Sequence, residues 1–328
     1  MALYGFYEVI TNLIFMKNLI NRAFFGVLFV CLLVAGYYFF SSQSLPIEEV
    51  QNEEVRNENT NNFYFLPSVP DEITFAGEKV PVHHIDVYES LDRELLVNSH
   101  LHSQTFRILK LAPRYFSVID PILKANDIPL DFRYVAVAES GLNPRAISSA
   151  GAVGIWQFMK GTATQYGLEV STGVDERYHL EKATRAACRY LKDSYAKFGN
   201  WTMVAASYNA GVAGMNRHIS AQNESSYYDL LLVEETSRYI FRILALKMIM
   251  EDPESFGYKV DEKYPLYKTT SLSVDTTIAD LAVFAKLYNT NYKMLKTLNP
   301  WLRSNNLTVA KGKSYTILLP VKGSRDVQ

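Results

Sequence analysis

Residues 139–159 read ESGLNPRAISSAGAVGIWQFM, and residues 132–138 in front of them (FRYVAVA) form a largely apolar segment that predicts a helix. We expect this helix to end by Gly141, because Pro144 and the residue before it do not favour its continuation. A carboxylate in the last turn of such a helix faces apolar neighbours and the negative end of the helix dipole, which both disfavour its charged form. The pattern therefore predicts that Glu139 stays protonated near neutral pH and serves as a general acid. An ordinary exposed glutamate is the alternative interpretation, since surface glutamates are common.

The second half of this stretch combines glycines with an amide side chain inside an apolar run. Gly151 and Gly154 permit a tight turn and the close approach of a ligand to the backbone. Gln157 needs a hydrogen-bonding partner if it is buried. Trp156 could stack on a ring of a ligand or fill the core. Further along, residues 201–211 (WTMVAASYNAG) predict a helix that ends before a C-terminal glycine.

The composition of the chain excludes several classes of protein. The chain has 328 residues, with 33 Lys and Arg against 34 Asp and Glu, so its net charge of -1 gives no basic field of the kind that nucleic-acid binders carry. Hydrophobic residues make up 48%, which excludes collagen-like and fully disordered chains. This length allows two domains, or one domain with appendages.

The cysteines and histidines give no reason to expect a disulfide, a metal or another cofactor. Cys31 lies in an apolar run near the N-terminus and Cys188 in a distant helical pattern, so we expect no disulfide between them. The histidines form no HExxH motif, and only His83 and His84 are close neighbours in the sequence. We therefore predict catalysis without a metal or a cofactor.

The N-terminal region predicts a membrane anchor. Residues 23–40 read AFFGVLFVCLLVAGYYFF and carry no charge over 18 positions, which is near the minimum for a membrane-spanning helix. Lys17 and Arg22 precede this run, so the positive-inside rule places that end in the cytoplasm. A cleavable signal peptide is the alternative, because Val34-Ala35-Gly36 offers small residues for cleavage. Met16 resembles a natural start, which would make the residues before it an upstream extension.

The rest of the chain divides by composition into a polar tether, a helical domain and a small C-terminal module. The tether is too polar to order itself, and the helical periodicity ends near Pro253. The expected divisions are a cytoplasmic N-terminus at 1–22, an anchor at 23–40, a tether and lead-in at 41–87, a helical domain at 88–257 and the module at 262–321.

Four motifs follow one another in a fixed order. They are Glu139-Ser140, GAVGIWQFM at 151–159, YNAG at 208–211, and Glu235-Thr236 with Tyr239 shortly after. In this order they resemble the motifs of the lysozyme-like soluble lytic transglycosylase superfamily, in the branch of membrane-bound lytic murein transglycosylase D. The resemblance covers roughly residues 90–250. His179-Leu180 departs from it, since the family usually has Asp-Pro there, and Ser207 and Ser237 replace a common Ala and a frequent Arg.

The resemblance implies a reaction and a location. Such enzymes cleave the β-1,4 bond between N-acetylmuramic acid and N-acetylglucosamine in peptidoglycan, and they leave a 1,6-anhydromuramic acid end. This reaction fits a motif with a single acid: glycosidases of the usual kind need two carboxylates, whereas the next acidic residue after Glu139 is Glu169. One glutamate would act first as acid and then as base. The implied place is the bacterial cell envelope, with the catalytic domain in the periplasm, glycan strands and the membrane as partners, and no nucleic acid.

The resemblance also implies roles for individual side chains. Ser148 would help to orient the substrate's acetamido group, Gln157 and Met159 would line the cleft, Tyr208 would contact the sugar at the cleavage point, and Glu235 would contact saccharide. Two other functions stay open, a non-catalytic peptidoglycan-binding protein and a hydrolase of the lysozyme type.

The C-terminal module has a strand–helix–helix–strand pattern. Residues 266–269 and 315–320 are strand-like, residues 278–288 have helical spacing, and a second helix is expected at about 292–299. This order resembles a LysM peptidoglycan-binding module, although Val274-Asp275-Thr276 stands in place of the usual Gly-Asp-Thr. A purely structural cap is the alternative. The expected fold is thus mainly α: an N-terminal anchor helix, a lysozyme-like helical transglycosylase domain with a small β-hairpin region, and a small βααβ module.

Overall fold

A computed structural model of the protein describes residues 68–324, which belong to one compact unit. The predicted cytoplasmic N-terminus at 1–22 and the predicted anchor at 23–40 lie outside the described residues. Between residues 68 and 324, no helix combines the length and the apolar character that crossing a membrane requires.

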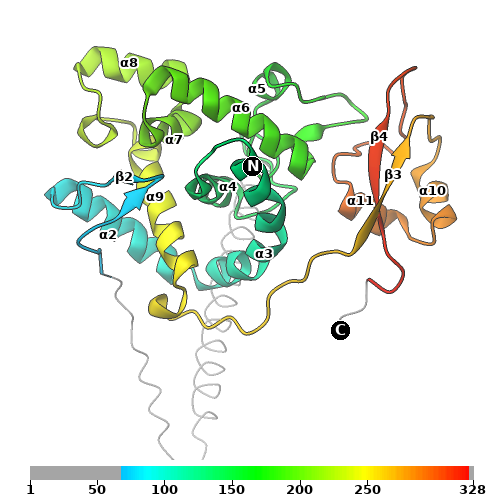
Figure 1. Cartoon of the computed structure of the whole chain (residues 1–328), viewed down its shortest axis with the longest axis horizontal. Helices are drawn as coiled ribbons and strands as arrows, with labels where there is room; N and C mark the ends of the chain where they lie inside the picture. The colour runs from blue at the N-terminus through cyan, green and yellow to red at the C-terminus, as the bar shows by residue number, and fades with distance from the viewer. Residues whose placement is uncertain (1–67, 325–328) are drawn as a thin grey trace, which may run out of the picture. The chain divides into compact units, whose positions relative to one another are not determined.

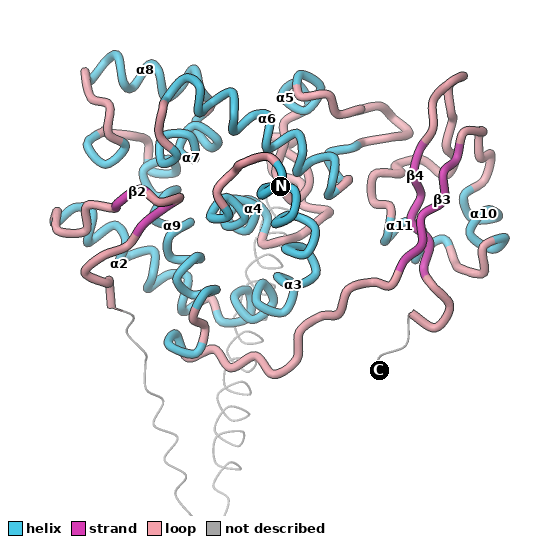
Figure 2. Tube along the Cα trace, viewed as in Figure 1, coloured by secondary structure: helices cyan, strands magenta, loops and turns pink. Residues whose placement is uncertain are grey.

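Helices dominate the described chain, in agreement with the predicted fold class (Figures 1 and 2). Between residues 68 and 257 the α-helices are α2 (Ile85–His100), α3 (His102–Ala125), α4 (Arg133–Ser140), α5 (Lys160–Gln165), α6 (Leu180–Phe198), α7 (Trp201–Ala210), α8 (Val212–Gln222) and α9 (Glu234–Glu251). Short 3-10 turns occur at Leu130–Phe132, Glu176–Tyr178, Tyr227–Asp229 and Glu254–Phe256.

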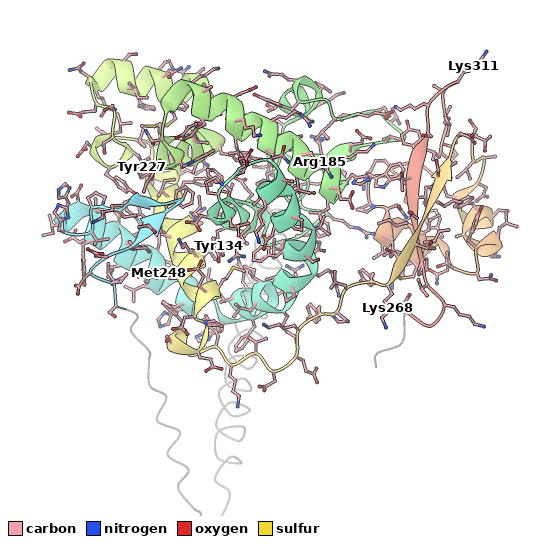
Figure 3. The ribbon with its side chains drawn as sticks, viewed as in Figure 1. Tyr134, Arg185, Tyr227, Met248, Lys268 and Lys311 are labelled. Carbon is pink, nitrogen blue, oxygen red and sulfur yellow. The ribbon has the colours of Figure 1, made fainter. Side chains whose placement is uncertain are left out.

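Helix α9 is the centre of this helical region. It packs against α2, α4 and α7 (Figure 1), and its residues Ile240, Ile243 and Leu244 are completely buried. Buried aromatic rings fill the space around it, among them those of Tyr134 and Tyr227 (Figure 3). Burial of apolar surface at about 25 cal/mol per Å² makes this packing the main source of stability for the helices.

The segment expected to be tether and lead-in contains ordered structure at its end. Strands β1 (Thr74–Phe75) and β2 (Glu78–Lys79) form a short antiparallel hairpin. Phe75 is completely buried, with its ring centroid 5.4 Å from that of Phe132. The carboxylate of Glu78 accepts hydrogen bonds from the backbone N–H groups of Trp201 and Thr202, and so caps the N-terminus of α7. These are long-range contacts, which is why no local sequence pattern predicted the hairpin.

The C-terminal module has the predicted strand–helix–helix–strand order. It consists of β3 (Thr269–Val274), α10 (Leu281–Leu287), α11 (Tyr292–Leu298) and β4 (Tyr315–Pro320). The strands are antiparallel, with Thr269 opposite Pro320 and Val274 opposite Tyr315. The first strand therefore begins at Thr269, the last residue of the predicted 266–269, while the Lys268 carbonyl accepts from the Val321 N–H over 2.9 Å just beyond β4. The side chain of Asp280 caps α10 by accepting from the N–H groups of Ala282 and Val283.

Candidate active site

Glu139 lies in the last turn of α4, as predicted. The helix ends at Gly141, whose φ of 56° is left-handed and whose N–H donates to the Val137 carbonyl over 2.8 Å. Val135, Ala136 and Val137 are buried against the core, which fixes the end of the helix and the position of the carboxyl group. Tyr239, a buried residue of α9, donates a hydrogen bond from its hydroxyl to Glu139 Oε1.

The surroundings of Glu139 disfavour its ionised form. Burial raises the pKa of Glu139 to about 7, and the negative charge of Glu235 acts in the same direction. The hydrogen bond from Tyr239 and the positive charge of Arg242 act in the opposite direction but do not offset the burial. A substantial fraction of Glu139 is therefore protonated near neutral pH, as a general acid requires.

A cleft of about 630 Å³ opens beside this carboxyl group. One wall comes from α3 and contributes Ser103, Gln104 and Arg107. The end of α4 and the segment after it contribute the rest of the lining. The lining residues of these two parts are Ala138, Glu139, Ser140, Gly141, Asn143, Ala146, Ile147, Ser148 and Gln157. Glu139 is the single carboxylate among the residues that line this cleft.

We refer to residues 146–158 as the lip, because Ala146, Ile147, Ser148 and Gln157 of this segment line the cleft. Their backbone folds into a small β-structure in which Val153 pairs with both Ile147 and Phe158. Ser148 Oγ accepts from the Ala152 N–H over 3.0 Å, which leaves the hydroxyl proton free to be donated.

The amide of Gln157 is satisfied within the lip itself. Its Nε2 donates to the Gly154 carbonyl over 2.7 Å, so the partner that the sequence required is found in the backbone. Gln157 also has a positive φ of 47°, a conformation that non-glycine residues adopt only where the surrounding structure enforces it. Gly154, at φ 81°, lies so close to the Arg177 carbonyl that an added Cβ would be 2.2 Å from that oxygen.

The structure brings together three of the six predicted site residues. Glu139, Ser148 and Gln157 line the cleft, whereas Met159, Tyr208 and Glu235 are absent from its lining. Met159 is half exposed at the start of α5. Glu235 is exposed on α9, where its carboxylate accepts from Asn209 Nδ2 over 3.1 Å.

Tyr208 and Trp156 lie behind the cleft and pack against each other, with ring centroids 6.3 Å apart. The Tyr208 hydroxyl donates to the Trp156 carbonyl over 2.7 Å, and burial raises the pKa of Tyr208 well above its ordinary value, with a contribution from the charge of Glu139. Trp156 is completely buried, and its indole N–H donates to Thr184 over 2.9 Å. Of the two interpretations of Trp156, core packing is therefore correct.

Two features of the site were missed by the sequence analysis. Tyr239 was quoted within a motif without a role, although it is the hydrogen-bonding partner of Glu139. The wall formed by Ser103, Gln104 and Arg107 has the spacing of any solvent-facing side of a helix, so the sequence held no signal that would have identified it. The Arg107 guanidinium donates to the Gly141 carbonyl over 3.2 Å and so reaches the end of α4.

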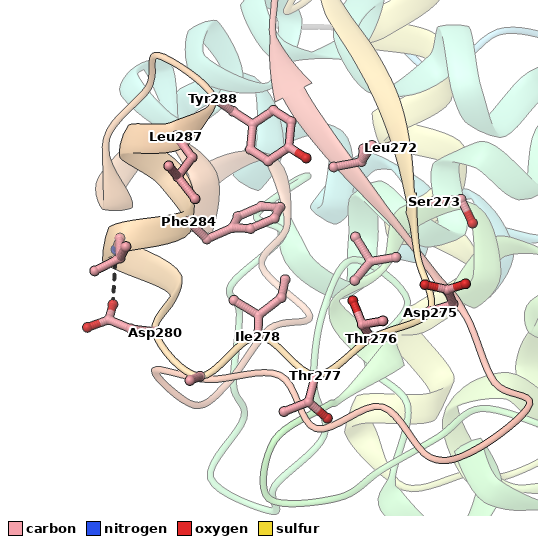
Figure 4. A pocket seen from close by; sticks show the side chains of 13 residues that line it. Leu272, Ser273, Asp275, Thr276, Thr277, Ile278, Asp280, Phe284, Leu287 and Tyr288 are labelled. Atoms are coloured by element: carbon pink, nitrogen blue, oxygen red, sulfur yellow. Dashed lines mark hydrogen bonds between the residues drawn. The ribbon is translucent and has the colours of Figure 1, made fainter.

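A second groove, of about 460 Å³, lies within the C-terminal module (Figure 4). Its lining comes from the end of β3, the turn at 275–280 and α10. The rings of Phe284 and Tyr288 lie on the α10 side, and Leu272 lies on the strand side (Figure 4). The groove thus combines apolar and aromatic surface with the polar side chains of the turn.

Comparison with protein families matches two parts of the chain. Residues 120–231 match the Transglycosylase SLT domain, and residues 270–323 match the Soluble lytic transglycosylase C-terminal LysM-like domain. The first match contains Glu139, Ser148, Gln157, Met159 and Tyr208.

Individual relatives are similar over longer or shorter parts. The chain is 28% identical over 244 residues to membrane-bound lytic murein transglycosylase D of Escherichia coli, which covers 72% of this chain and 52% of that protein. It is 32% identical over 149 residues to peptidoglycan transglycosylase gp16 of Escherichia phage T7, covering 44% of this chain and 11% of that protein. The chain therefore spans about half the length of the first of these relatives. Among solved structures, the 70 kDa soluble lytic transglycosylase of Escherichia coli is similar with a TM-score of 0.38 and 19% identity, over 61% of this chain and 41% of that one.

Proposed function

Since this chain contains a transglycosylase SLT domain followed by a LysM-like domain, we propose that it is a peptidoglycan lytic transglycosylase. One observation carries the proposal. Glu139, with a pKa raised to about 7, is the single carboxylate that lines the cleft. A glycosidase that uses water or a protein nucleophile is expected to place a second carboxylate on the opposite side of the sugar. A lytic transglycosylase needs only one, because its nucleophile belongs to the substrate.

The proposed reaction has two steps at Glu139. Protonated Glu139 first donates its proton to the glycosidic oxygen as the bond to the muramyl anomeric carbon breaks, while the substrate's acetamido oxygen stabilises the cationic centre. The resulting carboxylate then accepts the proton of the muramyl 6-hydroxyl as that oxygen bonds to the anomeric carbon. The product carries a 1,6-anhydro ring, Glu139 is protonated again, and no water is consumed. The hydrogen bond from Tyr239 holds the carboxyl group in place through both steps.

The other predicted residues take supporting roles in this proposal. Ser148 would donate its hydroxyl proton to the acetamido oxygen, and Gln157 would contact the sugar from the lip. Tyr208 would act from behind by supporting the lip through its bond to the Trp156 carbonyl. Met159 and Glu235, which are outside the cleft lining, would contact saccharide only further along a bound strand. The groove in Figure 4 would contact glycan through Phe284 and the turn before α10.

We also propose a place in the cell envelope. The relative in Escherichia coli is named as membrane-bound, and the uncharged run at 23–40 would anchor this chain with the helical region outside the cytoplasm. A protein comprising residues 63–328 should accordingly stay folded in solution without the anchor. Failure of that protein to remain soluble would contradict the proposed division of the chain.

Product analysis tests the proposed reaction. Purified sacculi are digested with the protein comprising residues 63–328, and the fragments are analysed by mass spectrometry. We expect muramyl ends that are lighter by one water than reducing ends, because ring closure replaces hydrolysis. Reducing ends as the main product would identify a lysozyme-type hydrolase. Binding to sacculi without any fragments would identify a non-catalytic peptidoglycan-binding protein.

A further inference from the structure

The lip needs support from outside itself. It carries Ser148 and Gln157 into the cleft, and its internal hydrogen bonds, such as Ser148 N–H to the Ala152 carbonyl at 2.9 Å and Phe158 N–H to the Val153 carbonyl at 3.1 Å, close the turns of the segment. The positive φ of Gln157 is an unfavourable conformation that the surroundings have to enforce. Part of that support comes from the segment 173–177, which contacts the lip through Arg177 and has no residue in the cleft lining.

Arg177 is the residue of this segment that holds the lip. Its guanidinium Nη1 donates to the carbonyls of Gly151 and Phe158, each over 3.2 Å, and thereby joins the two sides of the lip. Its Nε and Nη2 donate to Asp175 over 3.0 and 2.7 Å. Only 10% of the Arg177 side chain and 9% of the Asp175 side chain are exposed, so this ion pair is shielded from water and fixed in geometry. The Arg177 backbone carbonyl also packs against Gly154.

The same segment is bonded on its other side to the C-terminal module. The Asp175 N–H donates to the Trp301 carbonyl over 2.9 Å, and the Arg303 N–H donates to the Gly173 carbonyl over 2.8 Å. Between these two bonds, Val174 and Leu302 form an antiparallel bridge. The segment is therefore a link with the lip on one side and the module on the other.

Apolar packing closes this interface. Val153 of the lip, together with Val174 and Tyr178, is buried in one cluster with module residues that include Leu302 and Tyr315. The Trp301 ring lies in a stack, with its centroid 5.9 Å from that of His179 and 5.6 Å from that of Tyr315. Arg303 lies over the Tyr178 ring at 4.1 Å, and Lys313 forms an ion pair with Glu169 at the edge.

From these contacts we infer that the C-terminal module is a positioning element of the cleft, which holds the lip through Asp175 and Arg177 in the conformation that presents Ser148 and Gln157. The module acts in this way whether or not its own groove binds glycan. The catalytic consequence rests on the proposed function, whereas the structural coupling between the module and the lip does not.

The test measures amide hydrogen exchange in the lip and activity in the same variants. Trp301→Ala removes the centre of the stack, and Arg303→Ala with Lys313→Ala weakens the interface through exposed side chains if the first variant fails to fold. Arg177→Gln breaks the link on the lip side. The matched control is Lys293→Ala, at an exposed position of α11 that lies outside the module groove and outside the interface contacts.

We expect faster exchange at residues 146–158 in the interface and Arg177 variants, with α9 unchanged, because local opening of the lip no longer has to break these contacts. On a short soluble peptidoglycan fragment, kcat/KM should fall on the order of 10–100-fold, the loss typical of misplaced positioning groups. Lys293→Ala should change neither the exchange nor kcat/KM. Unaltered exchange in the lip of a folded interface variant would overturn the inference. If the wild-type protein proves inactive, the proposed function fails, but the exchange measurement still decides whether the module holds the lip.

Discussion

Replacing Glu139 by Gln should change stability and activity in opposite directions. The amide keeps the size of the carboxyl group but cannot ionise, so it removes both the proton that the reaction needs and the penalty for burying a charge. The two effects can be measured on the same samples. Together they test whether burial, rather than the position at a helix end alone, raises the pKa of Glu139.

The stability effect follows from the raised pKa. The unfolded chain releases the Glu139 proton near its ordinary pKa of 4.5, whereas the folded protein keeps it until about pH 7. Between these values the folded state binds the extra proton, so raising the pH through this window lowers the free energy of unfolding. The full loss is about 3 kcal/mol above pH 7, because each tenfold change in an acid constant corresponds to about 1.4 kcal/mol.

Thermal melts of wild type and Glu139→Gln should therefore coincide near pH 4 and diverge as the pH rises. Near pH 8 the variant should melt higher, by roughly 6–12 °C, since 1 kcal/mol corresponds to about 2–4 °C for a chain of this size. Clearance of a sacculus suspension should meanwhile fall 10²–10⁴-fold or more, on the order of 3–5 kcal/mol of barrier. Parallel melting curves at all pH values would refute the burial of this carboxyl group. Undiminished clearance by the folded variant would remove Glu139 from the mechanism.

Three further predictions concern the surroundings of the cleft. Tyr239→Phe removes a hydrogen bond that lowers the pKa of Glu139, so the alkaline limb of the pH–activity profile should move to higher pH, and an unchanged limb would contradict this role. Gly154→Ala should destabilise the fold by about 1–3 kcal/mol more than Gly151→Ala, as measured by denaturant titration. Both glycines have a positive φ, but only Gly154 lies against a neighbouring carbonyl. Burial lowers the pKa of His179 to about 4 from an unfolded value of 6.5, so the free energy of unfolding should fall as the pH falls through this window. In thermal melts between pH 6.5 and 4, His179→Phe should lose less of its melting temperature than the wild type, and an equal loss would contradict the role of His179.

Local sequence patterns predicted the features that depend on neighbouring residues, such as helix ends. The end of α4 at Gly141 followed from the glycine and the proline after it, and the structure confirms it. The second helix of the module, α11, also lies where its spacing predicted it. The position of Glu139 in a helix end among apolar residues was enough to predict the direction of its pKa change.

Long-range contacts could not be predicted in this way. Phe75 and Glu78 stabilise the hairpin before α2 through partners more than fifty residues away, so their own segment contained no periodic pattern. Tyr239 meets Glu139 across a hundred positions of sequence, although each lies in a motif that was identified. The motifs indicated which residues belong together, but only packing determines that Glu139, Ser148 and Gln157 face the cleft while Tyr208 supports it from behind.

The pairing of β3 with β4 has a consequence for the order in which the parts of this chain can fold. The strand that closes the module is the last element of the described chain, so the module cannot form until synthesis has passed Pro320. The bonds from Trp301 and Arg303 to the segment 173–177 must follow that event. The residues that line the cleft, which lie between 103 and 157, are therefore made well before the contacts that hold the lip. On the proposed function, the full rate of cleavage would then require synthesis at least as far as Pro320.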